Sequence, residues 1–389
     1  VNAVVAREGD PTGFLAENWV LIRDAIAVGN NGSVYMAGDT NNATTADDIV
    51  ASWSAGTPTL LAREGSAVPV LGTVNFGSTN NGVNVLDNGA VRWISTGLGG
   101  AATGQTQMLY QVLGGTDSVL ARSGITVPTN QLAPDQTISA FNGADRLVSA
   151  TQAGDFYYPV TLNGPATSNV GYVLNNGMTV QEGVIPSGSG FATAPTSMSS
   201  GQTHMITGNG QYRIARGALL TSNLDFVMLN NNVVAVTDSP IATGSSLLWD
   251  DTVYGPTFVF STANNYGEVA VGGLINSGNP AADAIVMFYA AGKATQVLAE
   301  GDGVDLNGDG LANDNVQISI LDDDTMTVTD GNIAYLACEL TDGGGTYVGD
   351  AVIEVYLPLT GDVDGSGEVD AVDIDQVIAA FGSTTPGII

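Results

Sequence analysis

The chain has 389 residues, and 44% of them are apolar, which is enough to bury a large core. Its 39 acidic residues outnumber 9 basic ones, and the net charge of -30 argues against nucleic acid and anionic membrane surfaces as partners. No run of about 20 apolar residues predicts a membrane span, and the excess of carboxylates favours divalent cations and cationic partners.

Charged residues make up only 12% of the chain, so Ser, Thr, Asn, Gln and Gly must form most of the surface. This composition suits a secreted bacterial surface protein better than a cytosolic enzyme. The sequence begins with Val1, which we interpret as a mature or trimmed N-terminus. The single cysteine, Cys338, rules out an internal disulfide and is expected to be a buried thiol within a strand.

A four-residue phrase recurs along the chain and is called the signature phrase below. The clear copies are Ala6–Gly9, Ala62–Gly65 and Ala121–Gly124, and weaker copies begin at Val180, Val236 and Ala299. The six copies lie at intervals of 56, 59, 59, 56 and 63 residues. A period of this size predicts a repeat architecture.

The segments between the copies are predicted to form antiparallel strands. In the first repeat, strands at 25–29 and 33–37 flank Asn30-Asn31-Gly32, a strong signal for a tight hairpin turn. Strands at 49–53 and 59–63 complete a four-stranded unit. The later repeats predict strands at 83–86, 90–94, 108–112, 118–122, 171–174, 178–180, 225–229, 233–236, 284–289 and 295–299.

The last repeat predicts strands at 325–328, 333–338 and 351–357, and no signature phrase follows them. One copy instead stands alone at residues 1–9. We therefore predict an all-β fold, a six-bladed β-propeller of four-stranded blades that the N-terminal strand closes by pairing with 351–357. Pairing of residues 1–9 with a neighbouring molecule is the alternative. The predicted repeats are about 10–66, 67–125, 126–184, 185–240, 241–303 and 304–360, which together with strand 1–9 form a propeller domain over residues 1–360.

Residues 362–373 follow the spacing of an EF-hand-type Ca²⁺ loop, with Gly367 at the position of the sharp turn. An Asp at the twelfth position resembles a dockerin half-repeat, which we place at 361–382, ahead of a tail at 383–389. The predicted ligands are Asp362, Asp364, Ser366, Glu368 (through its carbonyl), Asp370 and Asp373. A helix is predicted behind the loop. Its apolar face, together with the tail, gives a predicted interaction surface of Ile374, Val377, Ile378, Phe381, Ile388 and Ile389.

A second, weaker Ca²⁺ loop is predicted at 305–314, within the longest interval between signature phrases. Its twelfth position would be Val316, which cannot bind a metal, so Asp314 would have to substitute. The predicted ligands are Asp305, Asn307, Asp309, Leu311 (through its carbonyl), Asn313 and Asp314. The acidic run Asp322-Asp323-Asp324 is instead predicted to be a solvated turn.

The segment Val5–Pro11, together with hairpins such as Asn30-Asn31-Gly32, resembles a family of secreted bacterial propeller-like repeat proteins. Members of that family often carry a dockerin-like or anchoring segment at the C-terminus. The resemblance covers about residues 1–360. It implies an extracellular or cell-surface location and a repeated β fold, and it implies no reaction.

The sequence shows no constellation of catalytic residues. His204 is the only histidine and is expected to be structural, and the repeated Arg7, Arg63 and Arg122 are expected to form structural ion pairs. The preferred hypothesis is a non-enzymatic, Ca²⁺-stabilised structural protein of a surface layer, matrix or filament, which associates with itself or with another extracellular protein. A carbohydrate- or peptide-binding module tethered by the dockerin-like segment, and a secreted glycan-active hydrolase or lyase, are the alternatives.

Overall fold

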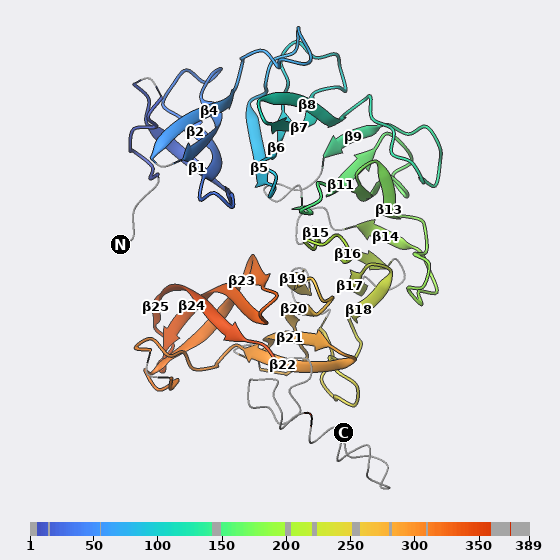
Figure 1. Ribbon diagram of the computed structural model, residues 1–389. Coiled ribbons are helices and arrows are strands. Elements are labelled where there is room, and N and C mark those ends of the chain that lie inside the picture. Colours follow the sequence, from blue (N-terminus) through green and yellow to red (C-terminus); the bar gives the residue numbers. More distant parts are fainter. Residues whose placement is uncertain are drawn as a thin grey trace. The chain divides into compact units, whose positions relative to one another are not determined.

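The structure is a computed structural model, and it describes residues 6–358 and residue 374 (Figure 1). Within that range, residues 15, 55, 142–148, 199–203, 220–223, 251–256, 280, 281 and 309 are not described. The chain divides into two compact units, Val1–Ser222 and Asn223–Ile389, and each is described by itself. In the described residues, no helix has the length and apolarity that crossing a membrane requires.

The described strands form six small antiparallel sheets, which is the blade organisation of a six-bladed β-propeller. In the first sheet the order is β1-β2-β3-β4, in the second β5-β6-β7-β8, and in the third β10-β11-β12-β13 with β9 beside β11. These strands are β1 (Trp19–Val28), β2 (Val34–Thr40), β3 (Asp48–Ser54), β4 (Thr57–Arg63), β5 (Thr79–Val85), β6 (Val91–Thr96), β7 (Gln107–Leu113), β8 (Thr116–Arg122), β9 (Ile138–Phe141), β10 (Ser149–Ala150), β11 (Phe156–Leu162), β12 (Val170–Leu174) and β13 (Gly177–Gln181).

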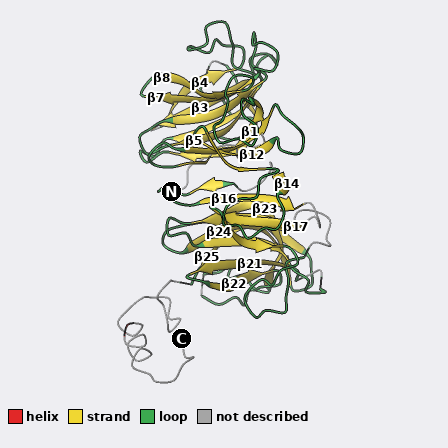
Figure 2. Ribbon diagram, turned by 90° about the vertical axis from the view of Figure 1, so that its right-hand side faces the viewer, coloured by secondary structure: helices red, strands yellow, loops and turns green. Residues whose placement is uncertain are grey.

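The fourth sheet has the order β14-β16-β17-β18 with β15 beside β16, the fifth has β19-β20-β21-β22, and the sixth has only β23-β24-β25. Figure 2 shows the strands of these sheets and the loops that connect them. The strands are β14 (Pro195–Met198), β15 (Met205–Ile206), β16 (Arg213–Leu219), β17 (Leu224–Leu229), β18 (Asn232–Val236), β19 (Phe258–Ala263), β20 (Val269–Leu274), β21 (Ala284–Ala290), β22 (Lys293–Ala299), β23 (Val316–Val328), β24 (Ile333–Asp342) and β25 (Tyr347–Tyr356). The predicted all-β propeller fold is confirmed.

Each copy of the signature phrase forms a four-residue β-turn, called the signature turn below. In the second copy the N–H of Ser66 donates to the carbonyl of Arg63 at 3.1 Å. Gly65, the third residue, has a φ of +75°, a left-handed conformation that glycine adopts without steric penalty. The same turn occurs at Arg7–Asp10, Arg122–Ile125, Gln181–Val184, Val236–Ser239 and Ala299–Asp302.

These turns correct the alignment of two weak copies. Val236 and Ala299 were aligned with the leading alanine of the phrase, but each begins a turn, which is the position of Arg63. The third turn residue of the fifth copy is therefore Asp238, whose φ is +61°. An aspartate side chain tolerates this left-handed region better than most residues, so this turn forms without a glycine.

The third residue of the signature turn also connects consecutive sheets. The N–H of Gly65 donates to the carbonyl of Phe76 at 3.0 Å, and that of Gly124 donates to Ile138 at 2.7 Å. Phe76 and Ile138 lie just before or at the first strand of the next sheet. Equivalent bonds join Gly9 to Trp19, Gly183 to Pro195, Asp238 to Trp249, and Gly301 to Ile318. The phrase recurs because this connection recurs.

The last two strands of the first five sheets pair with the same irregularity. In the first sheet Arg63 pairs with Ile49 and Ala62 with Val50, but Ala51 then pairs with Leu60, so Leu61 is left out of the ladder. Such a β-bulge bends and twists the outer strand locally. The residues left out in the other four sheets are Leu120, Thr179, Val234 and Val297.

The apolar cores lie between consecutive sheets. One core packs Val50 of β3 against Trp93 of β6 and Tyr110 of β7, all of them buried. Another packs Phe260 and Phe288 of the fifth sheet against Leu336 of the sixth. Side chains on both faces of a middle strand are therefore buried, which explains the continuous apolar runs in β3 and β21.

Replacing Gly65 with Ala is expected to destabilise the protein more than replacing Gly301 with Ala. Both residues have a left-handed φ, +75° and +86°, which disfavours alanine by roughly 1–2 kcal/mol. At Gly65 the added Cβ would also lie 2.8 Å from the carbonyl oxygen of Thr45, whereas at Gly301 it meets no atom within 4 Å. Urea unfolding of both variants measures the difference, and equal losses would contradict the contact with Thr45.

Candidate functional site

The stronger predicted Ca²⁺ loop, 362–373, lies outside the described residues, and so do Val377, Ile378, Phe381, Ile388 and Ile389. Of the predicted interaction residues, the structure describes Ile374, whose side chain is exposed. Ca²⁺ binding and docking through this segment stay predictions.

The weaker predicted Ca²⁺ loop is organised by two carboxylates. Asp305 accepts the N–H groups of Gly308 and Gly310, each at 2.7 Å. Asp314 accepts the N–H of Leu306 at 2.7 Å and the side-chain amide of Asn307 at 2.8 Å. Both carboxylates thus bind the loop from within, as in a turn of Asp, Asn and Gly residues.

The remaining ligands predicted for this loop are brought together only in part. The carbonyl of Leu311, a predicted ligand, accepts the N–H of Asn313 at 2.9 Å. Asp309 is outside the described residues. Among the residues that are described, no three His, Cys, Asp or Glu side chains form a group that could hold a metal ion. Asp305 and Asp314 do fit the ligand chemistry of Ca²⁺, which prefers carboxylate oxygens.

The acidic run Asp322–Asp324 was predicted to be a solvated turn, and this was wrong. It lies within β23, between Leu321 and Met326, where the register with β24 shifts. Cys338 is a buried thiol in β24, as predicted. The His204 ring lies 5.9 Å from that of Tyr157 and 5.7 Å from that of Tyr172.

Two arginines of the signature phrase bind the loop that precedes the third strand of their sheet, whereas Arg7 forms an ion pair with Asp10 of its own turn at 2.9 Å. Arg63 donates to the carbonyl of Ala46 at 2.6 Å, and Arg122, its counterpart one repeat later, donates to that of Gln105 at 3.3 Å. Arg63 also forms an ion pair with Glu17 at 3.0 Å. These contacts hold loops in place, which agrees with the structural role predicted for Arg63.

A charged cluster lies on the first sheet and reaches the second. Arg23 pairs with Asp39 at 2.8 Å and with Asp48 at 2.7 Å, and Asp48 also accepts a hydrogen bond from the amide of Asn80. Asp48 and Asn80 are fully buried, whereas Asp39 is partly exposed. Burial raises the pKa of Asp48 to about 7, although the hydrogen bonds from Asn80 and Arg23 oppose that rise.

The sixth sheet ends on an exposed edge in the part of the chain that the structure describes. The other five sheets end on the strand that leads into a signature turn, but β25 pairs only with β24. Alternate residues of β25 are exposed, and Val352 and Tyr356 expose 73% and 75% of their surface. Tyr347–Tyr356 contains two acidic residues, Asp350 and Glu354, but no Pro, Lys or Arg, so neither proline nor a basic side chain blocks strand addition at this edge.

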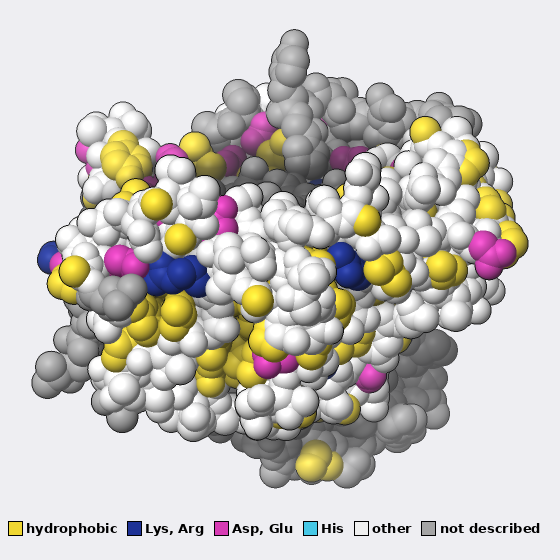
Figure 3. All heavy atoms as spheres, turned by 90° about the horizontal axis from the view of Figure 1, so that it is seen from above, with side chains coloured by type: hydrophobic (Ala, Val, Ile, Leu, Met, Phe, Trp, Pro, Cys, Tyr) yellow, Lys and Arg dark blue, Asp and Glu magenta, His cyan; other side chains and the backbone are white. Residues whose placement is uncertain are grey.

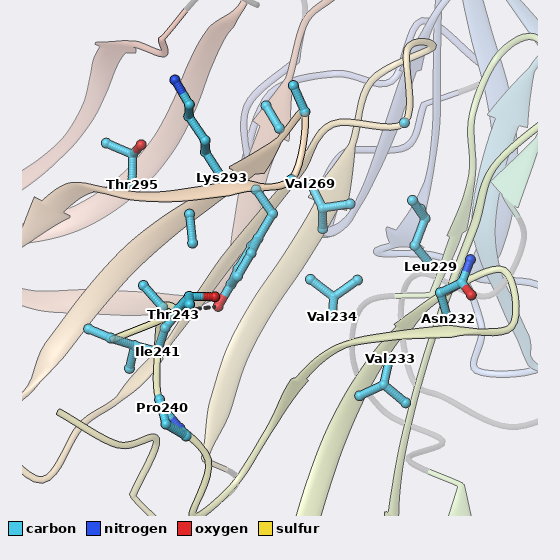
Figure 4. A pocket seen from close by; sticks show the side chains of 17 residues that line it. Leu229, Asn232, Val233, Val234, Pro240, Ile241, Thr243, Val269, Lys293 and Thr295 are labelled. Carbon is cyan, nitrogen blue, oxygen red and sulfur yellow. Dashed lines mark hydrogen bonds between the residues drawn. The ribbon is translucent and has the colours of Figure 1, made fainter. Parts of the chain in front are cut away.

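A cavity of about 1050 Å³ lies within the second unit. Three segments line it: the β17–β18 hairpin with Leu229 and Asn232–Val234, the loop Pro240–Thr243, and the β21–β22 hairpin over Tyr289–Thr295. Val269 and Gly267 complete the lining. In Figure 4, Lys293 and Thr295 lie on one side of the view, and Leu229, Asn232 and Val233 lie on the other.

The walls of this cavity combine apolar and polar surface in similar amounts. The hydroxyl of Tyr289 donates to the carbonyl of Ile241 at 3.0 Å, which ties the β21–β22 hairpin to the loop (Figure 4). Burial raises the pKa of Tyr289 to about 12, so the phenol stays protonated at neutral pH and remains a donor. Lys293 follows the left-handed residues Ala291 and Gly292, which form a two-residue turn, and its side chain is exposed.

Sequence reasoning missed both the charged cluster and the cavity. The cluster joins residues from separate strands of two sheets, and only the pairing of those strands shows that they meet. One feature of the sequence could have indicated the cavity: Lys293, the only lysine of the chain, lines it.

No protein-family model matches the chain, and no curated protein matches it. Among solved structures, prolyl oligopeptidase B from Galerina marginata in its apo form is similar over 82% of this chain, with 7% identity and a TM-score of 0.38. This chain spans only 38% of that peptidase chain.

Two further solved structures are similar to this chain. The β-propeller domain of the Trilobed protease from Pyrococcus furiosus matches 87% of this chain and 85% of its own length, with 6% identity and a TM-score of 0.36. The Hadza microbial sialidase Hz136 matches 86% of this chain and 66% of its own length, with 10% identity and a TM-score of 0.36.

The stability of the protein is expected to fall between pH 5 and pH 7.5, and Asp48→Asn should reduce that fall. The folded state raises the pKa of Asp48 from 3.8 to about 7, so it holds a proton that the unfolded chain releases. The stabilisation is complete below the unfolded pKa and is lost as the pH rises through the folded one. Urea unfolding should show a fall smaller by on the order of 1 kcal/mol in the variant.

Asp342→Asn is the control for this measurement. Hydrogen bonds from the N–H groups of Thr346 and Gly344 lower the pKa of Asp342, so its contribution changes only at acidic pH. Glu300, whose pKa burial raises to about 7, contributes with the same sign as Asp48, so Glu300→Gln should flatten the profile as well. If the free energy of unfolding of Asp48→Asn changed with pH in parallel with that of the unchanged protein, Asp48 would be ionised throughout this pH range.

Proposed function

We propose that this chain is a non-enzymatic extracellular structural protein, a Ca²⁺-stabilised propeller subunit that assembles with copies of itself into a surface layer, matrix or filament. The observation that carries the proposal is the exposed edge of β25. A long edge strand with exposed apolar side chains pairs readily with a strand from another chain. Val348, Val352 and Tyr356 supply those side chains.

The strand that fits this edge is encoded by residues 1–7. The turn at Arg7–Asp10 is a signature turn, and in the first five sheets the strand before such a turn is the last strand. Residues 1–5 are outside the described part of the chain. In the proposed assembly, residues 1–7 of one copy pair with β25 of the next, which makes the sixth sheet four-stranded like most of the others.

The common register of the other sheets specifies how this strand should pair. In the first sheet Arg63 opposes Ile49, Ala62 opposes Val50, and Thr59 opposes Ser52 after the bulge. The hairpins β1–β2 and β23–β24 close in the same way, with Gly29 bound to Ser33 and Thr329 bound to Ile333. If the strand 1–7 follows the same register, Arg7 is expected opposite Ala351, Ala6 opposite Val352, and Ala3 opposite Glu354.

The surface composition supports a structural role over one that depends on charged ligands. The face shown in Figure 3 consists mainly of uncharged polar side chains and backbone, with few charged groups between them. Such a surface is soluble and places few like charges at a contact between two copies. The net charge of -30 still opposes association at low ionic strength.

Cysteine cross-linking between chains tests the assembly. Ala3→Cys protein mixed with Glu354→Cys protein is expected to form disulfide-linked dimers under mild oxidation, because opposed residues bring their Cα atoms within the roughly 7 Å that a disulfide allows. Non-reducing electrophoresis and mass spectrometry measure the product. The native Cys338 is buried and should stay reduced.

Asp350→Cys is the matched control, because it is exposed on the same face of β25 as Glu354 but lies four residues, or about 13 Å, along the strand. It should give little dimer with Ala3→Cys. The chain that carries both Ala3→Cys and Glu354→Cys should give a ladder of covalent oligomers. A cross-link found only within single chains would overturn assembly and favour closure by the chain's own strand, and the absence of both products would overturn the register.

Ca²⁺ is proposed to stabilise this protein through the loops at 305–314 and 362–373. The support for the first loop is that Asp305 and Asp314 already converge on its backbone, and the support for the second is its ligand spacing. Extracellular Ca²⁺ sites bind at about 10⁻⁴–10⁻³ M, which suits a site that is filled outside the cell.

Addition of 10 mM Ca²⁺ is expected to raise the melting temperature relative to the chelated protein. Ca²⁺ at a hundred times its dissociation constant would stabilise by about 2.7 kcal/mol. Asp305→Asn keeps one oxygen for the N–H of Gly308 but replaces the oxygen that accepts from Gly310, and it removes the charge. Its chelated form should therefore melt somewhat below the unchanged protein, and its gain in melting temperature on addition of Ca²⁺ should be smaller. Asp364→Asn tests the second loop by calorimetric titration, and two sites that survive both variants would contradict these assignments.

A further inference from the structure

The cavity of the second unit contains the one cation of that half of the chain. After residue 222 the sequence has 25 acidic residues and a single basic one, Lys293. Lys293 lines the cavity and is exposed, and its ammonium group makes no ion pair or hydrogen bond with the residues that the structure describes. It is therefore available to a carboxylate from outside.

The cavity has the shape and lining of a site for an extended segment. β18 and β22, which supply two of its walls, are each the last strand of their sheet. Between them lie the apolar surfaces of Val234, Ile241 and Val269. The polar groups at its rim, Asn232, Thr243 and Thr295, are uncharged. Polar and apolar groups thus share the lining about equally, and ligand pockets reach about 1,000 Å³.

The charge balance restricts the ligand further. The 25 acidic residues after residue 222 give this half of the chain a strong negative charge, which repels phosphates and other multiply charged anions. A single carboxylate within an otherwise uncharged segment can pair with Lys293 and meets less of this repulsion. We infer that the cavity between β18 and β22 binds an extended peptide segment of a partner protein, whose apolar side chains fill the cavity and whose one acidic side chain pairs with Lys293. This site lies apart from the proposed assembly edge on β25.

The test uses an acetylated, amidated seven-residue peptide of alternating Val and Thr with one central Glu, labelled with a neutral fluorophore. Fluorescence anisotropy should show saturable binding to the whole protein. The same peptide with Gln in place of Glu should bind about two- to fivefold more weakly, which is the range of an exposed ion pair. Lys293→Gln should weaken binding of the Glu peptide by the same factor and leave binding of the Gln peptide unaffected. Lys293→Arg keeps the positive charge, so it should retain the difference in affinity between the two peptides.

Two bulky substitutions on one strand locate the site. Thr295 lines the cavity, whereas its neighbour Gln296 does not, and both are exposed in β22, so neither Thr295→Trp nor Gln296→Trp should prevent folding. Thr295→Trp is expected to abolish binding, and Gln296→Trp to leave it unchanged. Equal effects of the two variants, equal affinity of the Glu and Gln peptides, or no saturable binding below millimolar concentration would each overturn the inference.

Discussion

A single backbone geometry, the left-handed third residue of the signature turn, determines how this protein is built. Its positive φ turns the chain after an outer strand and directs one N–H group at the start of the next sheet. Six such turns occur, and every one makes that hydrogen bond. The individual hydrogen bond stabilises by only about 1 kcal/mol. Its effect on the fold comes from position, because each bond fixes where the next sheet begins and therefore which apolar faces meet.

The bulge before five of these turns and the arginine within two of them serve the same connection. The bulge twists the outer strand where it approaches the turn, and Arg63 and Arg122 hold the preceding loop against it. Polar contacts between the hairpins formed by the first two strands of neighbouring sheets add a second link in each unit. Asn30 donates to Asp87 at 2.7 Å, and Asn265 donates to Asp330 at the same distance. The first and second sheets, and likewise the fifth and sixth, are thus joined by hydrogen bonds at both ends, with an apolar core between them.

Much of the fold could be predicted from the sequence because its signals are local. Turns such as Asn30-Asn31-Gly32 and the alternating strands beside them are encoded within about ten residues, and their repetition indicated the propeller. The errors arose where local signals are weak or compete with pairing. Asp238 replaces the expected glycine, so the fifth copy was aligned one residue too late. Asp322–Asp324 looks like a turn by composition, but it lies within β23, at the irregularity where the register with β24 shifts between Leu321 and Met326.

The candidate sites were less predictable because they depend on distant residues. Lys293 and Asn232 are separated by 60 residues, and only the placement of two hairpins brings both to one cavity. Arg23 and Asp48 are separated by a whole hairpin, and their pairing requires the register of three strands. A sequence records which chemical groups are present, but the geometry of such sites follows from long-range pairing.

The hairpins formed by the last two strands of the first five sheets differ in length, whereas every signature turn has four residues. The first hairpin, β3–β4, spans Asp48–Arg63, whereas β12–β13 spans only Val170–Gln181, four residues fewer. Two residues are missing from each strand, so the alternation of inward and outward side chains is unchanged. The tips of these hairpins are therefore natural insertion points. A protein engineer could extend them in steps of two residues per strand, or graft a loop onto them, without altering how one blade follows another.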